Sequence, residues 1–343
     1  MSTMNFKRRL PIPQEIKAEM PLSEDLAQAK VAFDAEVAQA LTGESGKKLL
    51  IIGPCSADRE ESVLEYMHRL ARVAEQVSDK LVIVPRVYTN KPRTKGTGYK
   101  GLLHQPDPER GVDMLEGVKA FRRMHLRVIQ ETGMFTADEM LYPANYRFIN
   151  DLLAYVAVGA RSVENQDHRQ VASGIEVPVG MKNPTGGSTD VMLNSIYAAQ
   201  HSHDFIYRNW EVTTTGNPLA HAVLRGYKGL DNINYPNYHY EYLERLAAEY
   251  CNGEYENPAV IVDCNHDNSG KRPLEQLRIC NEVLDSCSRS QAIAGVFAGF
   301  MVESYLEDGN QPVDGGVFGK SITDACLGWE KTDTLIKEIA DRL

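Results

Sequence analysis

The chain is 343 residues long, with 43% hydrophobic and 24% charged residues, a composition typical of a soluble globular protein with one large α/β domain or two smaller ones. Its formal net charge of -10 argues against a nucleic acid or an anionic membrane as a partner. No apolar run in the sequence approaches the roughly 20 residues that a membrane span requires.

Two further features of the sequence indicate a cytoplasmic protein. The first nine residues lead into proline and charged residues instead of an apolar segment, so we expect no secretory signal. The six cysteines form no C-x-x-C pair, which in a chain of this length favours reduced thiols over a disulfide framework.

Residues 1–47 predict an extension that precedes the main body of the protein. This segment is first polar and interrupted by prolines, and then helix-like from residue 23 to residue 41, with Ser23 and Glu24 at positions that favour a helix start. We expect the extension to serve in oligomerisation or regulation, in a homo-oligomer that is a dimer or a tetramer. Residues 48–343 are then expected to form a single domain.

From Lys48 onward, short apolar strands alternate with amphipathic helices. We expect strands at residues 49–55, 81–88, 135–141, 160–164, 178–183, 222–226, 259–266 and 295–303. The expected helices lie at residues 61–77, 113–131, 145–158, 190–200, 238–250, 274–287 and 323–343. Residues 205–210 and 212–215 predict an inserted β-hairpin before the sixth strand.

Eight such units in about 295 residues predict an α/β fold of the (β/α)8 TIM barrel type. A doubly wound open sheet is the alternative, but no G-x-G-x-x-G fingerprint follows the first strand. In a barrel, the chemistry lies on the loops after the carboxyl ends of the strands. The polar residues at the predicted strand ends are therefore the candidate site residues.

One group of these residues has the chemistry of a metal site. A thiol, an imidazole and two carboxylates form a mixed soft and hard ligand set that suits a divalent ion of the first transition row. All of them follow predicted strands: Cys55, His266, Glu303 and Asp324. Each of these residues taken singly is as easily explained by packing or by a salt bridge, so the hypothesis depends on their shared position.

A second group at the same strand ends is basic. It consists of Arg86, Lys91, Arg93, Arg161, Lys182 and Arg225. Cations crowded at one barrel mouth repel one another strongly unless a multiply charged anion neutralises them. Arginine matches phosphate and carboxylate with two parallel hydrogen bonds, and lysine supplies a point charge. We therefore expect a phosphorylated or carboxylated substrate.

Several motifs made of these residues follow one another in a recognisable order. They are Gly53-Pro54-Cys55-Ser56, Arg86-Val87-Tyr88, Lys91-Pro92-Arg93-Thr94, Gly159-Ala160-Arg161, Leu224-Arg225-Gly226, His266 with Asn268-Ser269, Met301-Val302-Glu303-Ser304 and Ser321-Ile322-Thr323-Asp324-Ala325-Cys326. Together they closely resemble the 3-deoxy-D-arabino-heptulosonate 7-phosphate (DAHP) synthases of type I, the microbial feedback-regulated class. The resemblance covers the chain from about Leu49 to its last residue.

This resemblance implies a transferase that condenses phosphoenolpyruvate with erythrose 4-phosphate and releases phosphate, the first step of the shikimate pathway of aromatic amino acid biosynthesis. It implies that Cys55, His266, Glu303 and Asp324 hold a divalent metal, with Mn²⁺, Fe²⁺ or Co²⁺ expected. Arg86, Arg161, Lys182 and Arg225 are expected to bind phosphoenolpyruvate, and Pro92, Arg93 and Thr94 erythrose 4-phosphate. Lys91 lies between the two substrates, and is expected to be catalytic together with Cys55, His266 and Asp324.

Two other functions remain open on the sequence. One is the related 3-deoxy-octulosonate 8-phosphate synthase, which takes arabinose 5-phosphate, although the Lys91-Pro92-Arg93-Thr94 motif favours the shorter sugar. The other is a non-catalytic paralogue that binds phosphoenolpyruvate and regulates a partner. A complete set of metal ligands argues against it.

The sequence also departs from the family in two places. The run from Lys95 to Lys100 is one residue longer than usual, with Tyr99 where tryptophan is common. Glu176 and Tyr207 stand where relatives that are inhibited by aromatic amino acids have small polar residues. These two side chains are large enough to fill the effector pocket, which counts against control by phenylalanine, tyrosine or tryptophan, but the sequence leaves an aromatic amino acid effector open.

Overall fold

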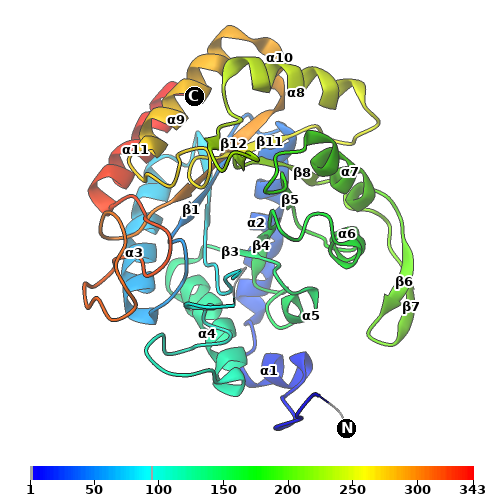
Figure 1. Ribbon diagram of the computed structural model, residues 1–343, viewed down its shortest axis with the longest axis vertical. Coiled ribbons are helices and arrows are strands. Elements are labelled where there is room, and N and C mark those ends of the chain that lie inside the picture. The colour runs from blue at the N-terminus through cyan, green and yellow to red at the C-terminus, as the bar shows by residue number, and fades with distance from the viewer. Residues whose placement is uncertain (1–2, 94–95) are drawn as a thin grey trace.

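The computed structural model describes residues 3–93 and 96–343, and eight parallel strands at its centre form a nearly closed barrel (Figure 1). In sheet order the strands are β2 (Leu81–Pro85), β1 (Lys48–Gly53), β12 (Phe297–Glu303), β11 (Val260–Asp263), β8 (Ala220–Leu224), β5 (Val179–Lys182), β4 (Leu153–Val158) and β3 (Thr136–Glu139). A parallel bridge between Arg86 and Ala137 joins the two outer strands, with the Val87 amide 2.9 Å from the Ala137 carbonyl oxygen. The predicted TIM barrel is confirmed, and the open doubly wound sheet is wrong.

The strands are apolar because the barrel interior covers one face of each strand and helices cover the other. In β1, the residues from Leu49 to Ile52 are completely buried. The surrounding helices are α3 (Glu60–Gln76), α4 (Met114–Thr132), α5 (Pro143–Tyr146), α6 (Gln166–Ala172), α7 (Thr189–Gln200), α8 (Tyr240–Asn252), α9 (Glu275–Arg289), α10 (Gln291–Val296) and α11 (Trp329–Arg342). None of the helices in the described ranges is long and apolar enough to cross a membrane.

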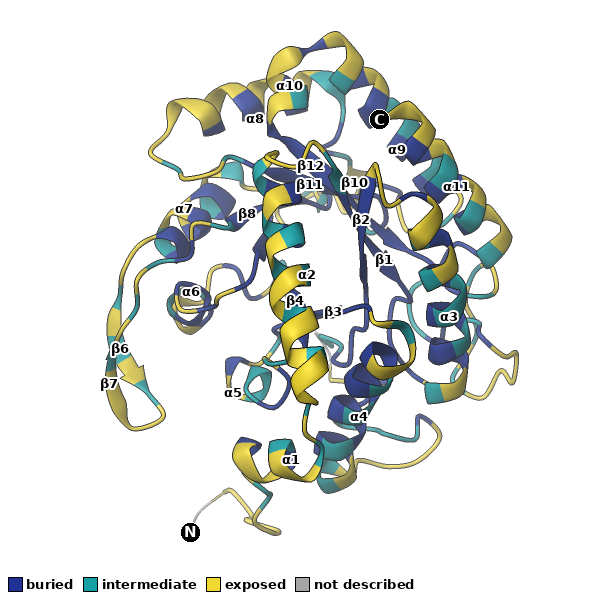
Figure 2. Ribbon diagram, turned by 180° about the vertical axis from the view of Figure 1, so that it is seen from behind, coloured by how far each residue is buried: buried dark blue, intermediate teal, exposed yellow. Residues whose placement is uncertain are grey.

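Two helices precede the first strand: α1 (Pro13–Glu19) and α2 (Glu24–Thr42). The second begins where the sequence predicts, because the Ser23 hydroxyl accepts a hydrogen bond from the Leu26 amide. Helix α2 lies across the amino-terminal end of the barrel (Figure 2), where it contacts β1, β2, β4 and β12. Its buried residues Val37, Ala40 and Leu41 help to close that end.

The fourth strand differs from the prediction. Residues 153–158, Leu-Ala-Tyr-Val-Ala-Val, were expected to end a helix, yet they form β4, and the predicted strand at residues 160–164 is a turn. A short, continuous apolar run does not distinguish a buried strand from a buried helix by its periodicity. This segment is wholly buried between β3 and β5, and pairing with these two strands makes it a strand. Arg161 therefore still follows the end of a strand, as predicted.

The last helix and two strand pairs can also be compared with the prediction. The last helix begins at Trp329 instead of residue 323, because residues 321–327 pair with residues 304–310 in isolated bridges. The inserted hairpin is confirmed as β6 (Asp204–Tyr207) and β7 (Trp210–Thr213), and it projects from the side of the barrel (Figure 1). A second pair, β9 (Tyr227–Lys228) and β10 (Asn234–Tyr235), was not predicted.

Candidate active site

A cavity of about 680 Å³ opens at the carboxyl ends of the barrel strands. The sequence-predicted residues that line it are Cys55, Arg86, Lys91, Pro92, Arg93, Arg161, Lys182, Arg225, His266 and Asp324. Glu303 lies just behind this wall and is completely buried. Thr94 lies outside the described residues. The structure thus gathers residues from almost the whole length of the chain around one mouth.

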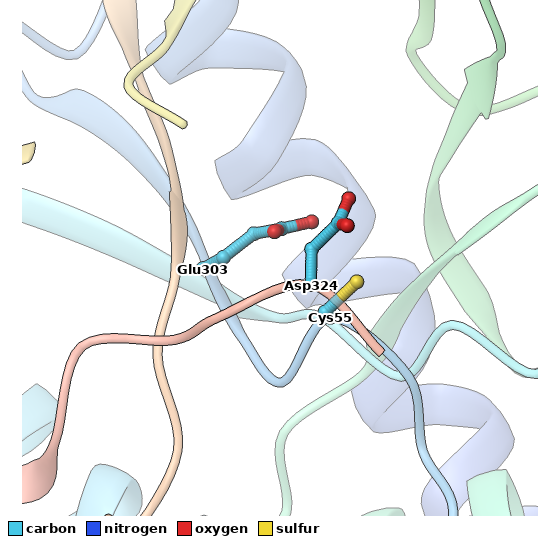
Figure 3. Close-up of side chains that lie close together, drawn as sticks. All are labelled: Cys55, Glu303 and Asp324. Atoms are coloured by element: carbon cyan, nitrogen blue, oxygen red, sulfur yellow. The ribbon is translucent and has the colours of Figure 1, made fainter. Parts of the chain in front are cut away.

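Three of the four predicted metal ligands lie together. One ligand atom from each of Cys55, Glu303 and Asp324 lies within 4.8 Å of the other two, and the three side chains point toward one another (Figure 3). The register explains part of this proximity, because Gly53 of β1 pairs with Glu303 of β12. A thiolate with two carboxylates fits a first-row divalent ion in the chemistry of its donors.

His266 lies beside this group of three. Its Nε2 atom is 3.8 Å from Glu303 Oε1, and its Nδ1 atom is 2.8 Å from Asp263 Oδ2. A carboxylate on the second ring nitrogen is the usual partner of a metal-binding histidine, because it fixes the ring orientation. The His266 backbone has a φ of 49°, a left-handed conformation that is uncommon for residues other than glycine.

The carboxylates of this group are held in the ionised form by nearby cations. Burial by itself would raise the pKa of Glu303, but Arg86 and His266 outweigh it, and the net effect lowers that pKa. Burial would likewise raise the pKa of Asp324, but Lys271 and His266 outweigh it, and the net effect lowers that pKa below its ordinary value. The Lys271 Nζ atom is 3.0 Å from Asp324 Oδ1. Both carboxylates are therefore charged at neutral pH.

The thiol of Cys55 has the opposite tendency. Burial raises its pKa, Glu303 adds to the effect, and Lys91 partly opposes it. The Lys91 ammonium donates a hydrogen bond of 3.2 Å to the Cys55 sulfur. Because a metal binds the thiolate, a cation at this sulfur favours the form that the metal requires.

Three of the predicted cations are buried, and each is paired with a carboxylate. The pairs are Arg86 with Glu303 (2.5 Å), Lys182 with Asp263 (3.1 Å) and Arg225 with Asp267 (2.6 Å). The sequence predicts an anionic ligand that neutralises these cations, but fixed carboxylates of the protein already neutralise part of their charge. The buried Arg86 Nη1 atom makes no hydrogen bond within the described residues, so the guanidinium retains a donor that a ligand can use.

Some residues that organise the site received no role from the sequence. Asp263 accepts hydrogen bonds from Lys182 and from the Asn265 amide, and cations lower its pKa despite its burial. The Asn265 side chain donates to Glu303 Oε2 at 2.6 Å. One sequence feature could have identified Asp263 and Asn265: they belong to a run of polar residues at the end of a buried strand, where each polar side chain requires a hydrogen-bond partner.

The chain is similar in sequence to known proteins over almost its whole length. The model of the DAHP synthetase I family matches residues 21–337. The Trp-sensitive phospho-2-dehydro-3-deoxyheptonate aldolase of Enterobacter agglomerans is 38% identical over 338 residues, which cover 96% of this chain and 93% of that protein. The Tyr-sensitive enzyme of Escherichia coli (strain K12) is 35% identical over 344 residues, which cover 96% of this chain and 92% of the relative.

A solved structure agrees over nearly the full length. Phospho-2-dehydro-3-deoxyheptonate aldolase from Francisella tularensis SCHU S4 superposes with a TM-score of 0.91 at 26% identity, and the match covers 99% of this chain and 98% of the other. The resemblance seen in the motifs is thereby confirmed. This chain belongs to the DAHP synthetase I family.

Proposed function

We propose that this protein condenses phosphoenolpyruvate with erythrose 4-phosphate and water to give DAHP and phosphate. The observation that carries the proposal is the cluster of Cys55, Glu303 and Asp324 beside buried cations at one barrel mouth, in a member of this family. Family membership counts against an octulosonate synthase. A non-catalytic paralogue would have no use for a complete set of ligands and cations.

The basic residues would hold and orient the two anionic substrates. Arg86, Arg161, Lys182 and Arg225 would bind the phosphate and carboxylate of phosphoenolpyruvate, and Pro92, Arg93 and Thr94 would bind erythrose 4-phosphate. Lys91, whose ammonium donates a hydrogen bond to the Cys55 sulfur, would act between the two substrates. Fixed cations that bring two mutually repelling substrates together can supply roughly 7–11 kcal/mol of the barrier through positioning.

The bond changes follow from this placement. C3 of phosphoenolpyruvate attacks the aldehyde carbon of erythrose 4-phosphate, and the aldehyde oxygen takes up a proton to become a hydroxyl group. Water adds at C2 and gives up its two protons, one for that hydroxyl group and one for the phosphate, as the bond between C2 and the phosphate oxygen breaks and C2 becomes a ketone. A divalent ion, held by Cys55, His266, Glu303 and Asp324, would supply Lewis acidity for the carbonyl group. Lys91, Cys55, His266 and Asp324 are the residues that we propose as catalytic.

The activity is tested by phosphate release from phosphoenolpyruvate in the presence of Mn²⁺. We expect release with erythrose 4-phosphate and much less with arabinose 5-phosphate. Equal release with the longer sugar would favour the octulosonate synthase, and no release with either sugar would favour the non-catalytic paralogue.

The metal is tested by chelation and by one substitution. We expect a chelator to abolish activity and Mn²⁺, Fe²⁺ or Co²⁺ to restore it. Cys55→Ser should weaken metal binding by at least about 10-fold, since even outer partners of metal ligands matter by about that much. Cys287→Ser, at a partly buried thiol on α9, is the matched control. Metal content measured by atomic emission, together with the circular dichroism of the same samples, separates loss of metal from loss of fold. Full activity of a metal-free preparation would overturn this part of the proposal.

We further propose that an aromatic amino acid regulates the enzyme from a second cavity. This cavity of about 580 Å³ lies between α2 and the β6–β7 hairpin, and Glu176 and Tyr207 line it without filling it. The open volume beside these two side chains counts against the expectation that they fill the pocket. Relatives are Trp-sensitive or Tyr-sensitive by name, which supports the assignment.

The effector is identified by thermal shift and by inhibition with each of the three aromatic amino acids. We expect one of them to raise the melting temperature and to inhibit, and Glu176→Ala to alter that response. Glu254→Ala, at an exposed glutamate far along the chain after α8, is the control. An absence of any shift with all three amino acids would contradict the proposal.

We also retain the proposal of a cytoplasmic homo-oligomer, either a dimer or a tetramer, in which residues 1–47 act as the oligomerisation or regulatory extension of the catalytic barrel at residues 48–343. Large apolar side chains exposed on the hairpin and on α2, namely Ile206, Trp210 and Val31, support contacts between subunits at this side.

A further inference from the structure

The segment after β2, which we call the mouth loop and define as the described residues 89–93 and 96–105, has an outgoing and a returning arm beside the cavity. The Lys91 amide donates to the Lys100 carbonyl oxygen at 3.1 Å, and the Leu103 amide donates to the Thr89 carbonyl oxygen at 3.4 Å. At Gly101 the backbone has a φ of 96°, and a Cβ atom there would lie 2.4 Å from the Thr89 oxygen. The outgoing and returning arms of the loop are thus in close contact.

Arg93, on the outgoing arm, is held by the returning arm. Its Nε atom donates a hydrogen bond of 2.7 Å to the carbonyl oxygen of Tyr99. The guanidinium lies along this backbone, since a Cβ atom placed on Gly98 would be 3.7 Å from Arg93 Cζ. A carbonyl group can fix the direction of an arginine only if its own residue is fixed in turn.

The side chain of Tyr99 provides that fixed point. It is only 2% exposed, although Thr97 and Gly98 directly before it are exposed. Its hydroxyl oxygen is buried without a hydrogen-bond partner among the described residues, so the anchor is the buried ring and not a hydrogen bond. Asp58 and Arg59, from the loop between β1 and α3, are the charged groups that act on this phenol.

We propose that Tyr99 is a positioning residue for the second substrate. Burial of its ring holds the carbonyl group that directs the Arg93 guanidinium, so that the mouth loop presents this cation in a defined place. Preorganisation of this kind improves binding of the ligand that the cation contacts and leaves other ligands unaffected. The inference rests on the proposed role of Arg93 toward erythrose 4-phosphate.

Steady-state kinetics with each substrate varied in turn test this inference. Tyr99→Leu is expected to raise the KM for erythrose 4-phosphate by about 10-fold, which corresponds to about 1.4 kcal/mol of binding free energy. The KM for phosphoenolpyruvate should stay unchanged. Tyr99→Phe keeps the buried ring and should restore the KM for erythrose 4-phosphate. Tyr250→Leu, at another completely buried tyrosine on α8, is the matched control for the general effect of removing a core ring.

A double-mutant cycle separates an effect through Arg93 from an effect on the fold. In an Arg93→Ala background, Tyr99→Leu should change the KM for erythrose 4-phosphate little further, because the group that it positions is gone. Additive effects, an equal rise in both KM values, or a rise with Tyr250→Leu would overturn the inference. If Arg93→Ala itself leaves the KM for erythrose 4-phosphate unchanged, the proposed role of Arg93 fails instead.

Discussion

Asp58 is a buried carboxylate in the loop between β1 and α3, and its environment makes the stability of the protein depend on pH. It is 3% exposed and accepts a hydrogen bond of 3.0 Å from the Tyr305 hydroxyl. Burial raises the pKa of Asp58 from 3.8 to about 6, against the opposing effect of its hydrogen bonds. Because the folded state prefers the protonated form, this residue stabilises the fold fully below pH 3.8, and the contribution is lost as the pH rises through about 6.

Asp58→Asn should therefore gain stability relative to the parent protein as the pH increases. The pKa difference corresponds to about 3 kcal/mol at neutral pH, which is the upper limit of the expected gain. We expect the free energy of unfolding of Asp58→Asn, measured with urea, to increase relative to that of the parent protein from about pH 5 to about pH 7.5. The exposed Asp314→Asn variant should show no such trend. A difference that is independent of pH would refute the assignment.

Among the secondary structure elements, α4 is joined to two distant segments by a single completely buried arginine. Arg122 donates to both carboxylate oxygens of Asp151, at 2.8 and 2.9 Å. It also donates to the Met20 carbonyl oxygen at 2.9 Å and to that of Phe148 at 2.8 Å. This residue thus ties the segment between α1 and α2 to the wall of the barrel.

Removal of this arginine should destabilise the protein more than removal of a surface arginine on the same helix. Breaking a buried ion pair costs about 3–5 kcal/mol, and because Asp151 is partly exposed we expect a loss of about 3 kcal/mol for Arg122→Leu. Arg127→Leu, at a side chain that pairs with Glu60 and Glu131 on the surface, should cost at most about 1 kcal/mol. Urea unfolding of both variants makes the comparison. Equal losses of unfolding free energy would show that the buried ion pair contributes no more to stability than the surface pairs.

Across the whole molecule, charge is distributed unevenly. The protein carries a formal net charge of -10, yet Arg86, Lys91, Lys182 and Arg225 all line the cavity at the carboxyl ends of the strands. Carboxylates line the same cavity, but the cations outnumber them, and a concave site with an excess of positive charge attracts anionic ligands even when the net charge of the protein opposes them. The barrel creates this contrast, because parallel strands place all of their carboxyl ends at the same side.

The alternation of strands and helices determines much of this architecture from the sequence alone. It predicts the barrel, and local residue patterns outside the repeat predict the inserted hairpin and the helix that Ser23 caps. It also indicates which polar residues follow strands, so the shared location of Cys55, Arg86, Lys182 and Arg225 could be predicted. These are local properties, because each depends on the residue types within one segment and on the position of that segment in a regular repeat.

The tertiary structure decides what depends on neighbours that are distant in the sequence. Burial between β3 and β5 makes a strand of residues 153–158, which local periodicity leaves ambiguous. Strand register and barrel closure select the carboxylates that neutralise Lys182 and Arg225, and set His266 beside the group of Cys55, Glu303 and Asp324. The sequence by itself thus determined the fold and the set of groups at the mouth. Only the tertiary structure decided their pairing, because ion pairing and desolvation depend on distances that no local pattern encodes.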